Sequence, residues 1–173
     1  LFFPGGDIGK LAVCGTVNDL TMMGAVARHL SLSFIIEEGF EVSLLERIIA
    51  SVASAAKQNK VRIVTGDLKV VERNAADKLF ITTSGIGRLI PGRRLLLESI
   101  RETDKVILTG NIGQHGLAVL SKRNELDLGF NIKSDCAGLG ELRIPLLSAG
   151  CALRFMRDPT RGGVATTLNE IAE

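Results

Sequence analysis

The chain is poor in the aromatic side chains that proteins stack against nucleic-acid bases. Its 173 residues include no Trp and no Tyr, and Phe occurs seven times. An excess of one charge is also missing, because 21 Lys and Arg against 19 Asp and Glu leave a formal net charge of +2. So small an excess offers little attraction for a phosphate backbone. The composition therefore argues against nucleic acid as a partner.

Long hydrophobic runs and paired cysteine motifs are missing as well. No stretch approaches the roughly 20 apolar residues that span a bilayer. The opening LFFPGGDIGK has neither the basic region nor the long apolar core of a signal peptide. Cys14, Cys136 and Cys151 are odd in number and show no Cys-x-x-Cys spacing, which favours neither a disulfide framework nor a zinc site. We interpret them as core or surface thiols and expect a protein of the reducing cytoplasm, with no membrane partner.

What the chain does have is the composition of a folded globular protein, with 46% hydrophobic and 23% charged residues. Both ends look cut. The chain opens on apolar Leu1, and an apolar helical face that includes Val164 and Leu168 runs to Glu173 without a helix stop signal. We therefore expect a fragment of a longer protein, truncated at both ends.

Strand and helix patterns alternate along the sequence, which favours an α/β or α+β fold. The clearest helix is an amphipathic one over residues 43–58, with Ser43 as its N-cap. One or two short helices are predicted within 10–27, and further helices at 116–123 and in the last residues. Strands are predicted at 31–36, 61–64, 70–71, 79–86 and 105–109. A Pro-Gly turn and mixed charges over 88–104 suggest a boundary between a first domain at 1–95 and the front part of a second at 104–173.

Two carboxylates stand out by their surroundings. Asp19 follows Asn18 inside an apolar segment, where a carboxylate is costly to bury unless it is paired, hydrogen-bonded or bound to a cation. A helix cap and a metal or phosphate site are about equally good explanations for it. Asp67 follows a short strand beside a Gly, a common place for a Mg²⁺ ligand, although the spacing alone favours a β-turn. Lys69 lies on the same strand face as Asp67 if the strand continues, where it either reaches a phosphate or is solvated.

Two loops could bind anions. Small residues from Gly110 to Gly116, Gly113 among them, precede a helix, although they match neither the Walker A nor the dinucleotide motif. His115 in this loop could donate to a phosphate or act as an acid or base, but a surface or capping role is more common. Arg157 and Arg161 flank an Asp before the last helix, which suits a polyphosphate or a partner. An Arg–Asp pair that fixes the loop is the favoured alternative.

Together and in this order, these segments resemble one family, the hydrogenase expression/formation protein HypE family. It belongs to the superfamily of aminoimidazole ribonucleotide synthetase-like (PurM-like) ATP-using enzymes. The matching stretches are collinear and cover most of the chain: LFFPGGDIGKLAVCGTVNDLTMMGA (1–25), FIIEEG (34–39), VRIVTGDLKVVERNAADKLFITTSGIG (61–87), GNIGQHGLAVLS (110–121), SDCAGL (134–139) and RDPTRGGVATTLNEIA (157–172). FFPGGDIGKLAV, the GDxKVVERxAADKLFI pattern and RDPTRGG are specific to HypE within the superfamily.

The resemblance implies a PurM-like N-terminal mixed sheet packed with helices, which pairs two chains into a homodimer, and the start of a second PurM-like α/β domain. It implies a hydrogenase maturation enzyme that uses ATP and Mg²⁺ to dehydrate a carbamoyl group on its C-terminal Cys. The product is a thiocyanate that supplies cyanide ligands to [NiFe]-hydrogenase iron. The implied partners are the carbamoyltransferase HypF and the HypC–HypD complex. A small-molecule kinase of the same superfamily and a non-catalytic maturation scaffold are the alternatives.

The resemblance also assigns roles to residues. It makes Asp19 and Asp67 the metal-binding carboxylates and Lys69 and His115 the catalytic side chains. The nucleotide-binding set that it implies is Asp7, Asn18, Asp19, Asp67, Gly113, Arg157 and Arg161. Two departures from the family pattern accompany these matches: Leu68 replaces a Thr, and Gln114 replaces an Asp beside the histidine.

Overall fold

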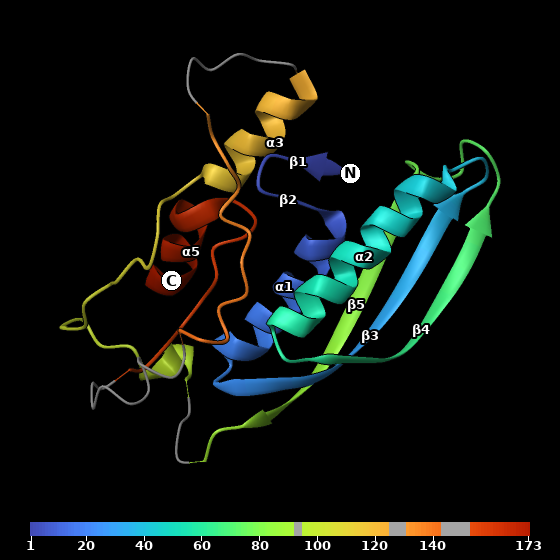
Figure 1. The fold of residues 1–173 in the computed structure, drawn as a ribbon. Helices are drawn as coiled ribbons and strands as arrows, with labels where there is room; N and C mark the ends of the chain where they lie inside the picture. Colours follow the sequence, from blue (N-terminus) through green and yellow to red (C-terminus); the bar gives the residue numbers. More distant parts are fainter. Residues whose placement is uncertain (92–94, 125–130, 143–152) are drawn as a thin grey trace.

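A computed structural model describes residues 1–91, 95–124, 131–142 and 153–173 of the chain. Its strands are β1 (Phe2–Phe3), β2 (Gly6–Asp7), β3 (Ala25–Glu37), β4 (Arg62–Val71) and β5 (Leu79–Leu89). Its helices are α1 (Ile8–Met22), α2 (Val42–Gln58), α3 (Gln114–Asn124) and α5 (Gly163–Ala172), with a short 3₁₀ helix η1 (Leu97–Ser99). Figure 1 shows how these elements are arranged.

A mixed sheet in the order β4-β3-β5 is the framework of the fold. β3 pairs in parallel with β4 and antiparallel with β5. The parallel pair requires a crossover connection, which α2 provides. The turn between β4 and β5 passes over the end of β3, which lies between these two strands. Asn74 and Lys78 in this turn have φ angles of 67° and 67°, in the left-handed region. The predicted α+β class with a mixed sheet is confirmed.

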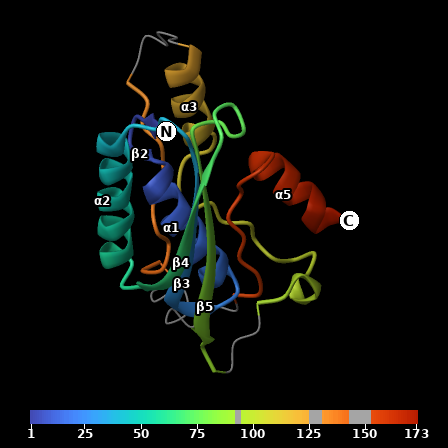
Figure 2. The ribbon, with the colours of Figure 1, turned by 90° about the vertical axis from the view of Figure 1, so that its right-hand side faces the viewer.

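Helices α1 and α2 cover one face of the sheet, as the nearly edge-on view in Figure 2 shows, and several side chains on the opposite face are exposed, so we call it the open face. The alternation of side chains along β3 explains the difference. Leu30 and Leu32 are buried under the helices, whereas Ser31, Ser33 and Ile35 point to the open face. The main core cluster is formed by Val13, Val17, Ala27, Leu30, Leu32, Val52, Ala55, Ala56 and Val61.

The two helices approach each other closely at Gly9. A Cβ at this position would lie 2.7 Å from the carbonyl oxygen of Ile48 and 2.9 Å from Cγ2 of Val52. Only Gly fits such a separation without a shift of the helices. Asp7 starts α1 by capping it, since its Oδ1 accepts hydrogen bonds from the backbone N–H groups of Gly9 and Lys10 at 2.8 and 3.0 Å.

Several element boundaries differ from the sequence-based expectation. The predicted helix at 43–58 is confirmed, but Ser43 is not its N-cap, because α2 begins at Val42 and Glu41 holds that position without a side-chain cap hydrogen bond. The helix expected over 10–27 ends at Met22, because the apolar residues from Ala25 onward pair with β5 instead. The two short strands expected at 61–64 and 70–71 are one continuous strand, β4, whose backbone pairs along β3.

The predicted strand at 105–109 is wrong. These residues form no strand, and the side chains of Val106 and Ile107 are 71% and 76% exposed. A segment of residues with high β-propensity forms a strand only when its backbone can pair with another strand. No strand pairs with it here in the described part of the chain. The domain division at 95–104 remains a prediction.

No helix among the described residues combines the length and the apolar composition of a membrane span. None of the residues of α5 is buried.

We predict that Ile48→Ala lowers the free energy of unfolding by about 2–5 kcal/mol, because the side chain is completely buried and its removal leaves a cavity. Urea denaturation of the full-length protein measures this change. Ile49→Ala is the matched control on the same helix, since Ile49 is 45% exposed and its removal should change the stability by about 0.5 kcal/mol or less. Equal effects of the two changes would contradict the described packing of α2.

Candidate functional site

Asp19 lies in the last turns of α1 with its side chain exposed. The helix-cap explanation is wrong, because α1 already contains this residue and a strand follows it. Asp158 lies close to it: burial raises the pKa of the Asp158 carboxyl, and the negative charge of Asp19 raises it further. The structure thus brings together two carboxylates from opposite ends of the chain, and a cation would relieve their repulsion. The described residues hold no cluster of three or more His, Cys, Asp or Glu with metal-binding geometry.

Asp67 and Lys69 lie side by side on the open face of the sheet. In the parallel register, Asp67 is opposite Ser33 and Lys69 is opposite Ile35. Their expected position on one strand face is therefore confirmed, and the β-turn explanation is wrong because these residues are inside β4. Oδ1 of Asp67 accepts a hydrogen bond from the N–H of Leu68 at 2.9 Å.

The sheet separates Asp67 from Asp19 within one chain. Asp67 is on the open face of an edge strand, whereas α1, which carries Asp19, packs on the covered face against β5 and β3. The two carboxylates are not brought together in a single chain. Their sharing of one metal ion remains a prediction that would require a second chain.

Asn18 attaches a distant segment of the chain to α1. Its Oδ1 accepts a hydrogen bond from the N–H of Leu139 at 2.7 Å, and its Nδ2 donates to the carbonyl of Ala137 at 3.0 Å. We call residues 134–141 the strap, because they run beside α1 in Figure 1. Asn18 therefore positions this part of the chain, and any role in nucleotide binding remains a prediction.

His115 lies at the start of α3, where this helix packs against the first residues of the chain. Its Nδ1 lies 2.9 Å from Oγ of Ser134 in the strap, which also accepts a hydrogen bond from the N–H of Cys136. Its ring meets that of Phe3 edge-on, with ring centroids 5.0 Å apart. These contacts hold the imidazole in one orientation, and an acid or base role for His115 remains a prediction.

The remaining predicted residues have structural contacts of their own. Asp7 caps α1. Gly113 has a φ of 75°, which favours Gly, and its carbonyl accepts the N–H of Leu117 at the start of α3. Arg157 forms an ion pair of 2.7 Å with Glu170 on α5, so the expected loop-fixing pair exists with a different acidic partner. Arg161 is exposed.

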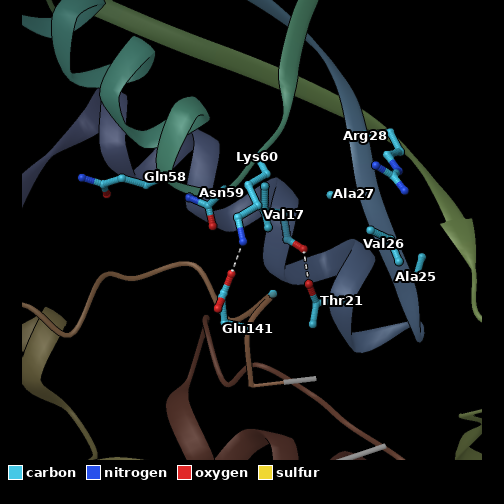
Figure 3. A pocket seen from close by; sticks show the side chains of 11 residues that line it. Val17, Thr21, Ala25, Val26, Ala27, Arg28, Gln58, Asn59, Lys60 and Glu141 are labelled. Atoms are coloured by element: carbon cyan, nitrogen blue, oxygen red, sulfur yellow. Dashed lines mark hydrogen bonds and ion pairs between the residues drawn. The ribbon is translucent and has the colours of Figure 1, made fainter. Parts of the chain in front are cut away.

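A cavity of about 140 Å³ lies at the other end of the strap, between α1, the start of β3 and the end of α2. Figure 3 shows Lys60 and Glu141 at its rim, joined by an ion pair of 2.7 Å, and Thr21 bonded to the carbonyl of Val17. None of the predicted site residues lines this cavity.

Sequence reasoning missed one pairing, that of Cys14 with Cys136. The first is buried in α1 and the second lies in the strap, and both are free thiols. A hydrogen bond between the two thiols lowers the pKa of Cys14 to about 7, although burial opposes the change. No spacing rule could have found the pair, because the contact depends on where the strap crosses α1.

Residues 1–89 match the family described as AIR synthase related protein, N-terminal domain. The chain belongs to this family of AIR synthase related proteins. Within it, the similarity is to HypE: carbamoyl dehydratase HypE of Rhodobacter capsulatus is 53% identical over 171 residues, which cover 99% of this chain and 50% of the relative. The resemblance expected from the sequence is confirmed.

Solved structures agree. A crystal structure of a HypE–HypF complex matches with 53% identity and a TM-score of 0.96, over 99% of this chain and 56% of the matched chain. A structure of HypE in complex with ATP matches with 49% identity and a TM-score of 0.95, over 99% and 51%. The chain spans about half the length of the curated relatives that it matches.

We predict that Asn18→Ala detaches the strap from α1 and lowers the free energy of unfolding by about 1–3 kcal/mol. The N–H of Leu139 and the carbonyl of Ala137 then lose their hydrogen-bond partners. The expected signature is faster hydrogen exchange at the N–H of Leu139. Asn124→Ala, at the exposed end of α3, is the matched control and should leave that amide unchanged. Unaltered protection of the Leu139 amide in the Asn18 variant would show that Asn18 does not hold the strap.

We predict that Asp19→Asn lowers the pKa of the Asp158 carboxyl, because it removes the nearby negative charge. Carbon-detected NMR titration of the side chain measures the change. Asp67→Asn is the control, since the sheet separates it from Asp158, and an equal effect of both changes would contradict the proximity.

The raised pKa of Asp158 also sets a pH dependence. The folded state holds this proton more tightly than the unfolded state, so the contribution to stability is present at low pH and is lost as the pH rises through the folded pKa. The Asp158→Asn variant should therefore lose less stability than the unchanged protein as the pH rises above the ordinary carboxyl pKa, which urea denaturation at a series of pH values measures.

Proposed function

We propose that the protein containing this chain is a HypE-type carbamoyl dehydratase that uses ATP and Mg²⁺. The observation that carries the proposal is the similarity, at 53% identity over 99% of the chain, to a relative named carbamoyl dehydratase HypE. The structure of HypE in complex with ATP, at 49% identity, supports ATP as the nucleotide. The substrate is a carbamoyl group on the thiol of a C-terminal Cys, and the product thiocyanate supplies cyanide to the iron of [NiFe]-hydrogenase.

When bound, Mg²⁺-ATP supplies the phosphoryl group that turns the poor leaving oxygen of an amide into phosphate, so that the carbamoyl group loses water overall and becomes a nitrile. The carboxylate of Asp19 would hold the cation together with that of Asp67 from a second chain. The ammonium of Lys69, exposed beside Asp67, stabilises negative charge that develops on the phosphates. His115, held by Ser134, takes up or delivers the protons of the carbamoyl nitrogen.

The residues around Asp19 fit such a cation site in one respect. Burial raises the pKa of the Asp158 carboxyl and the negative charge of Asp19 raises it further, so a counter-ion would relieve the repulsion between the two carboxylates. Asp67 keeps a strongly exposed position on its strand, which leaves it free to contribute from a second chain.

We further propose a cytoplasmic homodimer that pairs through the open face of the sheet. Ile35, Phe80 and Ile86 expose 39%, 50% and 72% of their side chains there, which supports burial against another surface. The free thiols of Cys14 and Cys136 fit a reducing compartment. HypF is a proposed partner because HypE in the HypE–HypF complex is 53% identical to this chain. The HypC–HypD complex is proposed as the acceptor of the cyanide.

We predict that Asp19→Asn and Asp67→Asn each weaken Mg²⁺-ATP binding to the full-length protein by at least about tenfold, which corresponds to about 1.4 kcal/mol. Isothermal titration calorimetry measures the affinity. Glu102→Gln, on an exposed loop, is the charge-matched control and should bind as the unchanged protein does. Unchanged binding in both Asp variants would refute their role at the metal.

Turnover separates the proposed reaction from its alternatives. ATP hydrolysis that responds to the carbamoylated C-terminal Cys and not to thiamine phosphate supports the dehydratase, and the reverse response supports a small-molecule kinase. A full-length protein that binds no ATP at all would support a scaffold.

A further inference from the structure

The strap is fastened to the first part of the chain at each end as well as in its middle. The backbone N–H of Ser134 donates to the carbonyl of Pro4 at 2.8 Å. Glu141 pairs with Lys60 at the other end, at 2.7 Å. Together with the two hydrogen bonds of Asn18, these contacts define the course of the strap along α1.

This course brings Cys136 to Cys14. Cys14 precedes Asn18 by four residues on α1, so both side chains project from the same helix face. Cys136 directly precedes Ala137, whose carbonyl Asn18 holds. Cys14 is only 3% exposed, whereas Cys136 is half-buried, and the two thiols are close enough for each to shift the pKa of the other.

The surroundings of the pair favour a reactive thiol. The Nδ2 of Asn59 lies 3.9 Å from Sγ of Cys14, and the charge of Lys10 adds to the stabilisation of a thiolate there. The thiolate is the form of cysteine that attacks oxidants. The hydrogen bond raises the pKa of Cys136, which therefore keeps its proton.

A metal site explains the pair less well than redox chemistry does. Structural zinc requires four ligands, and in the described ranges no third Cys, His, Asp or Glu joins the two thiols in a metal-binding group. Two adjacent thiols without further ligands are instead the arrangement that forms a disulfide.

We propose that Cys14 and Cys136 form a redox-sensitive dithiol site that a peroxide converts into an intramolecular disulfide between α1 and the strap. The Cys14 thiolate attacks one peroxide oxygen, the O–O bond breaks, and hydroxide leaves, so that a sulfenic acid forms on Cys14. The sulfur of Cys136 then attacks the sulfenic sulfur, its proton leaves with the hydroxyl group as water, and the S–S bond forms. The two thiols lose two electrons in total, and the peroxide is reduced.

The disulfide would act on the candidate site without belonging to it. It joins α1, which carries Asn18 and Asp19, to the strap, whose Ser134 holds His115. Oxidation therefore fixes these two parts of the protein relative to each other, and a thiol reductant releases them. The proposal does not depend on the proposed function, because the pair forms from the packing alone.

Peptide mapping by mass spectrometry of the full-length protein tests the proposal. After treatment with hydrogen peroxide and blocking of the remaining thiols with a maleimide, we expect one linked peptide pair that contains Cys14 and Cys136, lighter by two hydrogen atoms. Dithiothreitol should abolish it. The cross-link closes a long loop, so the melting temperature of the oxidised protein should rise by roughly 5 °C or more.

Variants separate this pairing from general oxidation. Cys136→Ser, at a half-buried position, should abolish both the linked peptide and the rise in melting temperature, whereas Cys151→Ser, outside the described residues, should leave both unchanged. The proposal is overturned if peroxide yields only sulfinic acid on separate cysteines, if the linked peptides join two different molecules, or if both thiols stay fully reactive with the maleimide.

Discussion

The position of the strap beside α1 depends on one amide side chain in particular, that of Asn18. A helix offers no free backbone groups along its sides, so an extended segment can be held there only by side chains or by apolar contacts. Asn18 supplies an acceptor and a donor at once, and both meet backbone groups of the strap. Because the strap also contacts His115 and Cys14, this single amide sets the positions of residues that the sequence places far apart.

The sheet imposes a second constraint, because one of its faces is buried and the other is exposed. Apolar side chains on one face are buried under α1 and α2, whereas the other face carries Asp67 and Lys69 among exposed side chains. A single chain therefore divides its acidic candidates between two surfaces. Covering the exposed apolar residues of the open face would be favourable, and we propose that a second chain covers them.

Prediction from the sequence succeeded where local patterns decide structure. The amphipathic period placed α2 within one residue of its start, and the motif order identified the family. It failed where a distant partner decides. Residues 25–27 joined a strand because β5 lies beside them, and 105–109 remained without a strand because no strand among the described residues pairs with them. The candidate site shows the same division: the shared face of Asp67 and Lys69 followed from a period of two, but the proximity of Asp158 to Asp19 did not.

The sequence by itself determined the family, the alternation of strands and helices and the types of side chain available for chemistry. These features depend on residue order and on periods of a few residues, which a linear chain already contains. Only the tertiary structure decided which face of the sheet stays open, which carboxylates meet, and that Cys136 crosses α1 at Cys14. Such contacts join residues that are separated by most of the chain, and they depend on where the strap and the helices pack rather than on any local pattern.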